Sequence, residues 1–283
     1  AIGILSLNYS GETEQVFYKI VDKTPMILLQ HAFSNYTSSI SFLDVLDDFH
    51  LIKNRIAIYG NVIKNYLAIN RKVSDDKMIV CGSLKYDSYR NANEKKKSTR
   101  IILVTLRPII THVEGIKLGL YEKYEHTINN LIKICAEIKD VEIIFKLHPQ
   151  QHPHNEILLE LIQSKDKDIR VLQTEPIKEL LIDCDLHINV APDNFDASSV
   201  ILEAMILRRP TLNIQLQSKE FEFEFMKDNA IRTIMFNADI KDEIHKLLNN
   251  PEEIKSLLKN SEVFLKRYLV NYGSSAEILI KNI

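Results

Sequence analysis

Short apolar segments alternate with longer amphipathic segments along most of the chain. The short segments are rich in β-branched residues, as buried parallel strands are, and the longer ones repeat apolar positions at helical spacing. This alternation predicts an α/β fold in which helices cover both faces of a parallel sheet. We expect strands at residues 2–7, 26–29, 55–58, 78–80, 100–105, 141–146, 169–172, 186–190, 211–214 and 233–236, and helices at 120–138, 155–164, 177–181, 198–207, 240–248 and 251–268.

One segment, residues 90–100, is polar, charged and aperiodic, so it fits neither a strand nor a helix. A solvated linker between domains explains it best, and a nucleic-acid-binding patch is the alternative. We therefore expect one domain over residues 1–92 and a second over residues 93–283. The first is short for a Rossmann-type domain and is interpreted as a partial one, whereas the second carries a full series of strands and helices and a closing C-terminal helix.

Composition narrows the class of protein. The chain has 283 residues, 45% of them hydrophobic, and a formal net charge of -2, so no basic excess favours a nucleic acid as a partner. Cys81, Cys135 and Cys184 are far apart and lie in apolar segments, which indicates buried free thiols in a reducing compartment. The lack of a bilayer-length apolar run and of a signal peptide favours a cytoplasmic protein, with peripheral membrane association left open.

The strongest local feature is a helix start that follows a buried strand. After the predicted strand 186–190 comes a polar loop, and Asp196, Ser198 and Ser199 then precede an apolar helix that carries Glu203. Free backbone N–H groups and the positive end of the helix dipole favour an anion such as a diphosphate there. A carboxylate at Glu203 can accept hydrogen bonds from ribose hydroxyls. The alternative is that Asp196 or Ser198 is an ordinary N-cap and Glu203 a solvated helix residue.

A histidine follows the predicted strand that ends at Lys146. His148 is expected at the carboxyl end of that strand, where open parallel sheets bind ligands. Its imidazole can donate to a phosphate oxygen of a leaving nucleotide, and its cationic form would offset the developing charge. Capping or packing is the alternative. His152 and His154 follow closely, but the prolines between the histidines prevent one helix from aligning the three rings. We expect no metal site.

Further polar residues lie at other strand ends. His31 follows the predicted strand 26–29 and is a candidate general base for an acceptor hydroxyl, with a plain loop histidine as the alternative. Arg107 ends the first strand after the linker, where its guanidinium can bind a diphosphate or form a surface ion pair. Gly82 and Ser83 are expected to shape a tight turn at the junction between the domains.

In order along the chain, four blocks resemble CDP-glycerol glycerophosphotransferases and capsule-type polysaccharide transferases, which belong to the GT-B superfamily. The set is specific as an ordered series, whereas each block is weak alone. Ala32 stands where that family has a glycine. The blocks are Gln30-His31-Ala32; Gly82, Ser83, Tyr86 and Asp87; Lys146-Leu147-His148-Pro149; and Asp196, Ser198 and Ser199.

The resemblance implies two Rossmann-type parallel-sheet domains that face each other across a cleft, the N-terminal one short or truncated. It implies that His31 is the general base and that His148, Ser198 and Ser199 hold the donor diphosphate. The helix start is also similar to that of UDP-N-acetylglucosamine 2-epimerases, which implies that Glu203 binds ribose. Their His-Arg-Arg-Glu-Asn block is missing, since the sequence around Arg107 differs, and this counts against epimerase chemistry.

These features favour a glycosyltransferase, or a glycerophosphate-type transferase, of surface polysaccharide or glycoconjugate synthesis. Its donor would be a nucleotide-activated sugar or a CDP- or CMP-linked group, its acceptor a glycan or lipid-linked molecule, and no separate cofactor is expected. An epimerase-like nucleotide-sugar enzyme and a catalytically silent nucleotide-sugar-binding subunit are the alternatives.

Overall fold

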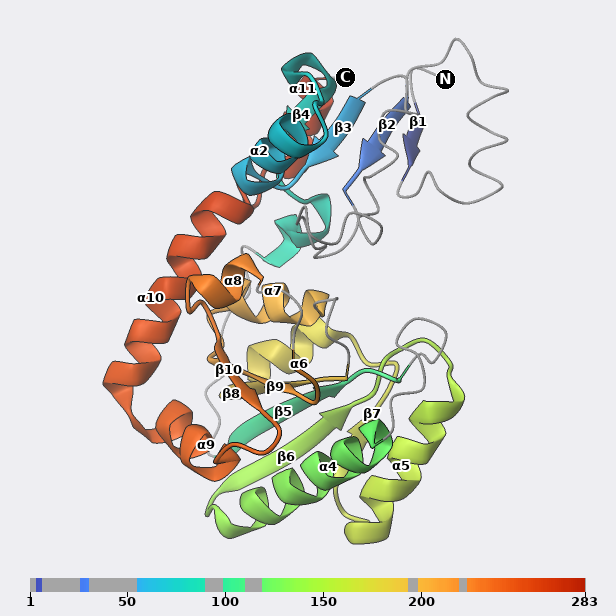
Figure 1. Cartoon of the computed structure of the whole chain (residues 1–283), viewed down its shortest axis with the longest axis vertical. Helices are drawn as coiled ribbons and strands as arrows, with labels where there is room; N and C mark the ends of the chain where they lie inside the picture. The colour runs from blue at the N-terminus through green and yellow to red at the C-terminus, as the bar shows by residue number, and fades with distance from the viewer. Residues whose placement is uncertain are drawn as a thin grey trace. The chain divides into compact units, whose positions relative to one another are not determined.

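The computed structural model describes residues 4–6, 26–30, 55–89, 99–109, 119–192, 198–218 and 223–282. The chain divides into two compact units, Ala1–Asn91 together with Val263–Ile283, and Ala92–Glu262 (Figure 1). The first division falls inside the polar segment expected to be a linker, most of which lies outside the described residues. The end of the chain differs from expectation, because it belongs to the first unit and not to the second.

The second unit is a parallel sheet of six described strands with helices on both faces. The strand order is β10-β9-β8-β5-β6-β7. The strands are β5 (Arg100–Leu106), β6 (Val141–Lys146), β7 (Arg170–Leu172), β8 (Leu186–Ala191), β9 (Thr211–Gln215) and β10 (Arg232–Met235); the helices are α4 (Leu120–Glu137), α5 (Pro153–Lys165), α6 (Ile177–Asp183), α7 (Ser199–Ile206), α8 (Glu224–Lys227), α9 (Ile240–Asn249) and α10 (Pro251–Tyr268), which crosses the boundary between the units.

The strand order reverses direction in the middle of this sheet. The chain enters at β5, adds β6 and β7 on one side, and then returns to add β8, β9 and β10 on the other side. The switch point therefore lies between β5 and β8. Open parallel sheets bind their ligands beyond the carboxyl ends of the strands at such a point.

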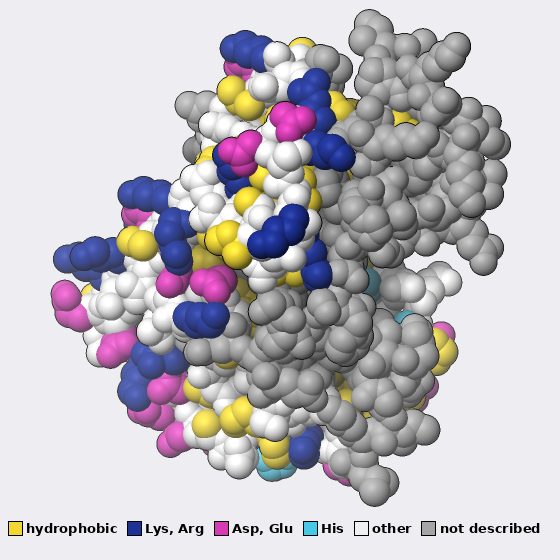
Figure 2. Space-filling model, turned by 45° about the horizontal axis from the view of Figure 1, so that its top comes forward, with side chains coloured by type: hydrophobic (Ala, Val, Ile, Leu, Met, Phe, Trp, Pro, Cys, Tyr) yellow, Lys and Arg dark blue, Asp and Glu magenta, His cyan; other side chains and the backbone are white. Residues whose placement is uncertain are grey.

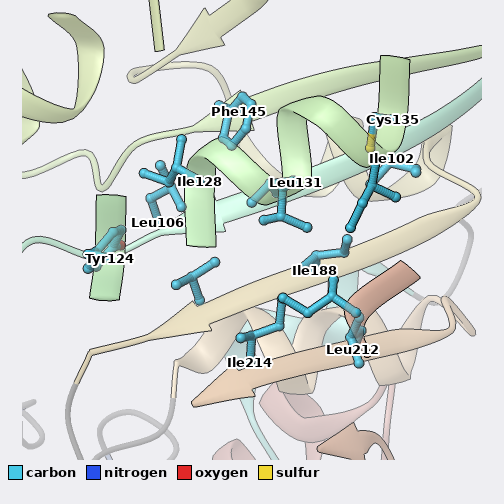
Figure 3. Packing of buried hydrophobic residues seen from close by; sticks show 14 of the residues in the cluster. Ile102, Leu106, Tyr124, Ile128, Leu131, Cys135, Phe145, Ile188, Leu212 and Ile214 are labelled. Carbon is cyan, nitrogen blue, oxygen red and sulfur yellow. The ribbon is translucent and has the colours of Figure 1, made fainter. Parts of the chain in front are cut away.

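One hydrophobic cluster of the second unit includes alternate residues of the central strands. Every second residue of the central strands, such as Ile102 and Ile188, is fully buried against α4, where Ile128 and Leu131 meet them (Figure 3). Large-to-small substitutions at such positions typically cost about 2–5 kcal/mol. This cluster confirms the prediction of buried strands covered by helices.

The opposite face of the sheet carries a buried polar row. His187 on β8 has no exposed surface; its Nε2 lies 2.9 Å from Thr105 Oγ1 on β5 and its Nδ1 lies 3.4 Å from Thr211 Oγ1 on β9. Burial lowers the pKa of His187 to about 3, so the ring is neutral. Two hydroxyls that can donate or accept thus satisfy both ring nitrogens inside the sheet.

The first unit contains a smaller parallel sheet in the order β1-β2-β3-β4. Its described elements are β1 (Ile4–Ser6), β2 (Met26–Leu29), β3 (Arg55–Ile58), α2 (Asn61–Asn70), the 3-10 helices η3 (Asp75–Lys77) and η4 (Leu84–Tyr89), β4 (Met78–Val80) and α11 (Ser275–Lys281). Both units are thus Rossmann-type parallel sheets, the first one short, as the sequence predicts.

The C-terminal segment completes the first unit. Leu279 of α11 is buried against Ile27, Ala57 and Ile79 of the small sheet. Asp87 accepts hydrogen bonds from the backbone N–H groups at the start of α11, with distances of 2.9–3.1 Å. The expected domain 93–283 is therefore corrected at its end: this last helix closes the first sheet, because a distant carboxylate caps it and its apolar side faces that sheet.

Gly82 and Ser83 lie in the first unit, at a turn beneath the C-terminal segment. Gly82 has φ +92°, and a Cβ added to it would overlap the carbonyl oxygen of Val270 and lie 2.5 Å from Ser275 Oγ. Ser83 is buried, and its carbonyl accepts a hydrogen bond from the backbone N–H of Tyr86. Glycine is needed here because the C-terminal segment passes directly over the turn.

All three cysteines are free and buried, as predicted, and burial raises the pKa of Cys81 to about 11 and of Cys135 and Cys184 to about 12.

On the face seen in Figure 2, basic and acidic side chains intermingle among the described residues. Within the described ranges, no helix has the length and apolar character needed to cross a membrane.

Candidate functional site

Predicted site residues meet at the carboxyl edge of the six-stranded sheet. Arg107 follows β5, His148 lies two residues after β6, and Ser198 precedes α7 in the connection that leaves β8. These three strands are neighbours in the order β8-β5-β6. The edge therefore brings together residues from both sides of the switch point. His31 and Asp196 lie outside the described residues.

The backbone at Arg107 is held by an aromatic side chain of α4. The hydroxyl of Tyr124 accepts a hydrogen bond from the Arg107 N–H at 3.1 Å and donates one to the Arg107 carbonyl at 2.9 Å. His154 of α5 packs edge-on against Tyr124 with 5.4 Å between ring centroids, and its Nδ1 accepts the Ile109 N–H at 2.8 Å. The turn after β5 is thus fixed by the helices beneath it.

His148 is half-buried, and its ring orientation is set by the backbone. Its Nδ1 accepts a hydrogen bond from the Gln150 N–H at 3.2 Å, so the neutral ring carries its proton on Nε2. Burial lowers the pKa of His148, and the charges of Arg107, Lys146 and His152 lower it further. The lowered pKa favours the neutral ring, which can donate a hydrogen bond from Nε2, over the cationic ring.

Lys146 is a functional candidate to which the sequence pattern gave no role of its own. It ends β6, is 5% exposed, and its Nζ donates to the carbonyls of Leu147, at 3.0 Å, and Gln173. Burial lowers the pKa of Lys146, whereas the charge of Glu175 opposes that shift. A buried cation at the end of β6, together with Arg107 after β5, makes this edge of the sheet electropositive. Lys146 ends the strand that pairs with β5, which Arg107 follows, and both charges act on His148.

The helix start after β8 has the geometry of an N-cap. Ser198 has an extended backbone, and its Oγ accepts the Val200 N–H at 3.3 Å, which is the capping role weighed as the alternative. Ser199 is the first residue of α7. Ser198 accepts the N–H groups of Val200, through Oγ, and of Ile201, through its carbonyl, and the N–H of Ser199 is the one at this end that stays suited to an anion among the described residues.

Glu203 is buried inside the second unit and not solvated. It lies on α7 with 1% of its surface exposed. Glu203 interacts with other groups of the protein. The interpretation as a solvated helix residue is therefore wrong, since a carboxylate at this depth requires polar partners. Ribose binding by Glu203 stays a prediction.

The three histidines near the start of α5 each use Nδ1 to accept a backbone N–H. His148 accepts from Gln150, His152 from His154 at 3.2 Å, and His154 from Ile109. Burial, followed by the charge of His152, lowers the pKa of His154 to about 4. In the described part of the chain, no three His, Cys, Asp or Glu side chains converge as metal ligands.

A pocket of about 510 Å³ lies elsewhere in the second unit, along the edge strand β10 and the first half of α10. Arg232 and Glu253, which form an ion pair of 2.8 Å, are among the residues that line it. None of the predicted site residues lines this pocket. We therefore base the candidate site on the carboxyl edge of the sheet.

No protein-family model matches the sequence, and no curated protein matches it either. Solved structures match over nearly the whole chain. A Listeria monocytogenes protein assigned as a UDP-N-acetylglucosamine 2-epimerase has a TM-score of 0.68 at 14% identity, over 98% of this chain and 71% of its own. MnaA of S. aureus, solved with UDP, has a TM-score of 0.68 at 12% identity, over 98% and 73%.

A glycosyltransferase from Rickettsia africae has a TM-score of 0.55 at 12% identity, over 99% of this chain and 76% of its own. At such identities the likeness is one of fold. The chain therefore resembles the GT-B superfamily in its fold, as the ordered sequence blocks predict.

Proposed function

We propose that this chain is a glycosyltransferase, or a glycerophosphate-type transferase, which binds a nucleotide-activated donor at the carboxyl edge of its six-stranded sheet. One observation carries the proposal: Arg107, Lys146 and His148 lie at the carboxyl ends of the neighbouring strands β5 and β6, at the switch-point edge of the sheet. Two cations beside a neutral N–H donor form a site for an anion with several oxygens, such as a diphosphate. S. aureus MnaA, which shares the fold, was solved with UDP, and this supports a nucleoside diphosphate as the anion.

Each group has a distinct task in this proposal. The Arg107 guanidinium offers several N–H donors to phosphate oxygens, and His148 donates from Nε2. The backbone N–H of Ser199 at the start of α7 donates to the same diphosphate, and Glu203 accepts hydrogen bonds from ribose. When the bond to the transferred group breaks, negative charge grows on the nucleotide, and donors already in place stabilise that charge.

The acceptor side of the proposal rests on the sequence resemblance. His31 removes the proton from a hydroxyl of a glycan or lipid-linked acceptor as that oxygen attacks the donor. The product belongs to a surface polysaccharide or another glycoconjugate. Replacing His31 by Ala should abolish transfer and leave donor binding unchanged, and unchanged transfer would remove His31 from the mechanism.

Ligand-dependent thermal stability tests the donor site directly. The protein is heated with CMP, CDP, UDP or GDP in separate samples. The cognate nucleotide at one hundred times its Kd should stabilise the fold by about 2.7 kcal/mol, whereas a nucleotide with the wrong base should stabilise it less. Replacing Arg107 by Ala should weaken that effect. The donor site is wrongly assigned if no nucleotide raises the melting temperature.

An epimerase-like activity is the second candidate. It is favoured by the TM-score of 0.68 to a protein assigned as a UDP-N-acetylglucosamine 2-epimerase and by Glu203 on the first turns of α7. Incubation with UDP-N-acetylglucosamine and no acceptor separates the two activities. Epimerised or hydrolysed sugar would support this second candidate and count against a transferase.

A further inference from the structure

The connection between β6 and α5 contains a side chain that holds both ends of the His148 turn. Asn155, in the first turn of α5, is 3% exposed. Its Nδ2 donates to the His148 carbonyl at 3.0 Å and to the Gln150 carbonyl at 2.8 Å. Both protons of the amide are therefore used to fix the first and third residues of one short turn.

The chemistry of these partners requires an amide at this position. Two carbonyl oxygens face the Asn155 NH₂ group, so the NH₂ must point towards them. The other amide atom, Oδ1, is buried without a hydrogen-bond partner among the described residues. A buried acceptor without a partner is costly, but the opposite orientation of the amide would place Oδ1 against two carbonyl oxygens and lose both donated bonds. An aspartate would place negative charge against the same two carbonyls.

The Asn155 bonds determine what His148 presents. Asn155 fixes Gln150, whose N–H is donated to His148 Nδ1 at 3.2 Å. With Nδ1 occupied as an acceptor, the single proton of the neutral ring lies on Nε2, which forms no hydrogen bond with any described residue. Without the Asn155 bonds the turn is free to move, and either ring nitrogen can carry the proton.

We propose that Asn155 is the positioning residue for His148, which it holds as the Nε2–H tautomer that donates to the donor diphosphate. The statement that His148 binds a diphosphate rests on the proposed function. The statement about its tautomer rests only on the hydrogen bonds of Asn155 and Gln150. Asn155 does not touch the donor; it acts through the turn.

The tautomer is measured first, without any nucleotide. Proton–nitrogen correlation spectra of the intact protein, with His148 assigned by a His148→Ala variant, should show the Nε2–H form in the wild type. Asn155→Ala should shift His148 towards a mixture of tautomers, and Asn155→Ser, which keeps one donor, should give an intermediate shift. Gln163→Ala on the exposed side of the same helix is the matched control and should leave the spectrum unchanged.

Nucleotide binding is measured second, with CDP and UDP separately. Asn155→Ala should lower the affinity for the tighter-binding nucleotide by about five- to thirty-fold. It should cause no further loss of affinity in a protein in which His148 is already Ala. Additive losses in the double variant would overturn the proposal, as would a wild-type tautomer in both folded Asn155 variants. If neither nucleotide binds the wild type, the proposed function fails, whereas the tautomer result still decides the role of Asn155.

Discussion

Two blocks that resemble the same transferase family are used in opposite ways by the two units. In the first unit, Gly82 lets the C-terminal segment approach closely, and Asp87 caps α11. In the second unit, the block around Lys146 and His148 is held by its neighbours, yet His148 keeps Nε2 unbonded among the described residues. Whether a motif residue can bind a ligand is thus best judged by which of its polar atoms form no hydrogen bond within the protein.

Replacing Gly82 by Ala should cause the largest loss and would test the structural half of this comparison. The left-handed backbone alone costs an L-residue roughly 1–2 kcal/mol, and overlap with the Val270 carbonyl adds to it. We expect the free energy of unfolding to fall by about 3 kcal/mol or more, measured by urea unfolding.

Gly119 offers a matched control for this variant. It also has a positive φ, +80°, but no atom of the described residues lies within 4 Å of an added Cβ. Gly119→Ala should therefore cost only the backbone strain of about 1–2 kcal/mol. Equal losses for the two variants would mean that the C-terminal segment does not press on Gly82.

Replacing His148 by Ala tests the functional half of the comparison. Removal of a hydrogen bond to a charged phosphate should lower nucleotide affinity by about ten- to one-hundred-fold, measured by calorimetric titration. The free energy of unfolding should change by less than about 1 kcal/mol, because the side chain is only half-buried. A large loss of stability with unchanged affinity would make this block as structural as that of Gly82.

Local periodicity predicted most of the architecture. The expected strands 26–29, 55–58, 78–80 and 141–146 have the observed bounds, because buried β-branched runs are read directly from the chain. Helix α11 was not expected, since it is short and its capping carboxylate lies on Asp87, far away in the sequence. Contacts that form only after folding leave no local pattern.

The same reason explains what was predicted of the site. Arg107 and His148 were expected because each follows a buried strand. Tyr124 and Asn155 were not, because their roles depend on how α4 and α5 dock beneath the turns. The lowered pKa of His148 was also beyond a sequence pattern, since it depends on burial and on the charge of Arg107, which follows a neighbouring strand.

Acid should destabilise the second unit through its buried histidines. His187 is fully buried, and burial lowers its pKa to about 3, below an unfolded value near 6.5. The unfolded chain therefore takes up the proton first, and stability present above about pH 6.5 is lost as the pH falls towards 3, by about 1.4 kcal/mol per pH unit. The pKa of His154 is lowered to about 4, so His154 makes the free energy of unfolding fall more steeply between about pH 6.5 and pH 4.

Urea unfolding between pH 7 and pH 5 measures this slope. His187→Gln should reduce it, whereas replacing the exposed His126 by Gln should leave it unchanged. If the slope is the same in all three proteins, the buried polar row of the second unit does not hold a neutral histidine.

The smallest effect is expected at Asp87, and it separates structure from function most cleanly. Burial opposes its ionisation, but hydrogen bonds from Ala276, Ser275 and Gly273 outweigh this and lower the pKa of Asp87. Asp87→Ala should cost about 1 kcal/mol, the usual value of a helix cap, and should speed amide exchange in α11. Because the folded pKa is lowered, the ionised cap stabilises the protein above about pH 4 and loses its effect below it.

The difference between wild type and Asp87→Ala should therefore shrink as the pH falls below about 4. Nucleotide affinity should be unchanged at neutral pH, because Asp87 is already bonded to the backbone of α11. A loss of affinity that exceeds the loss of stability would place Asp87 in the chemistry, and the block that contains it would then no longer be purely structural.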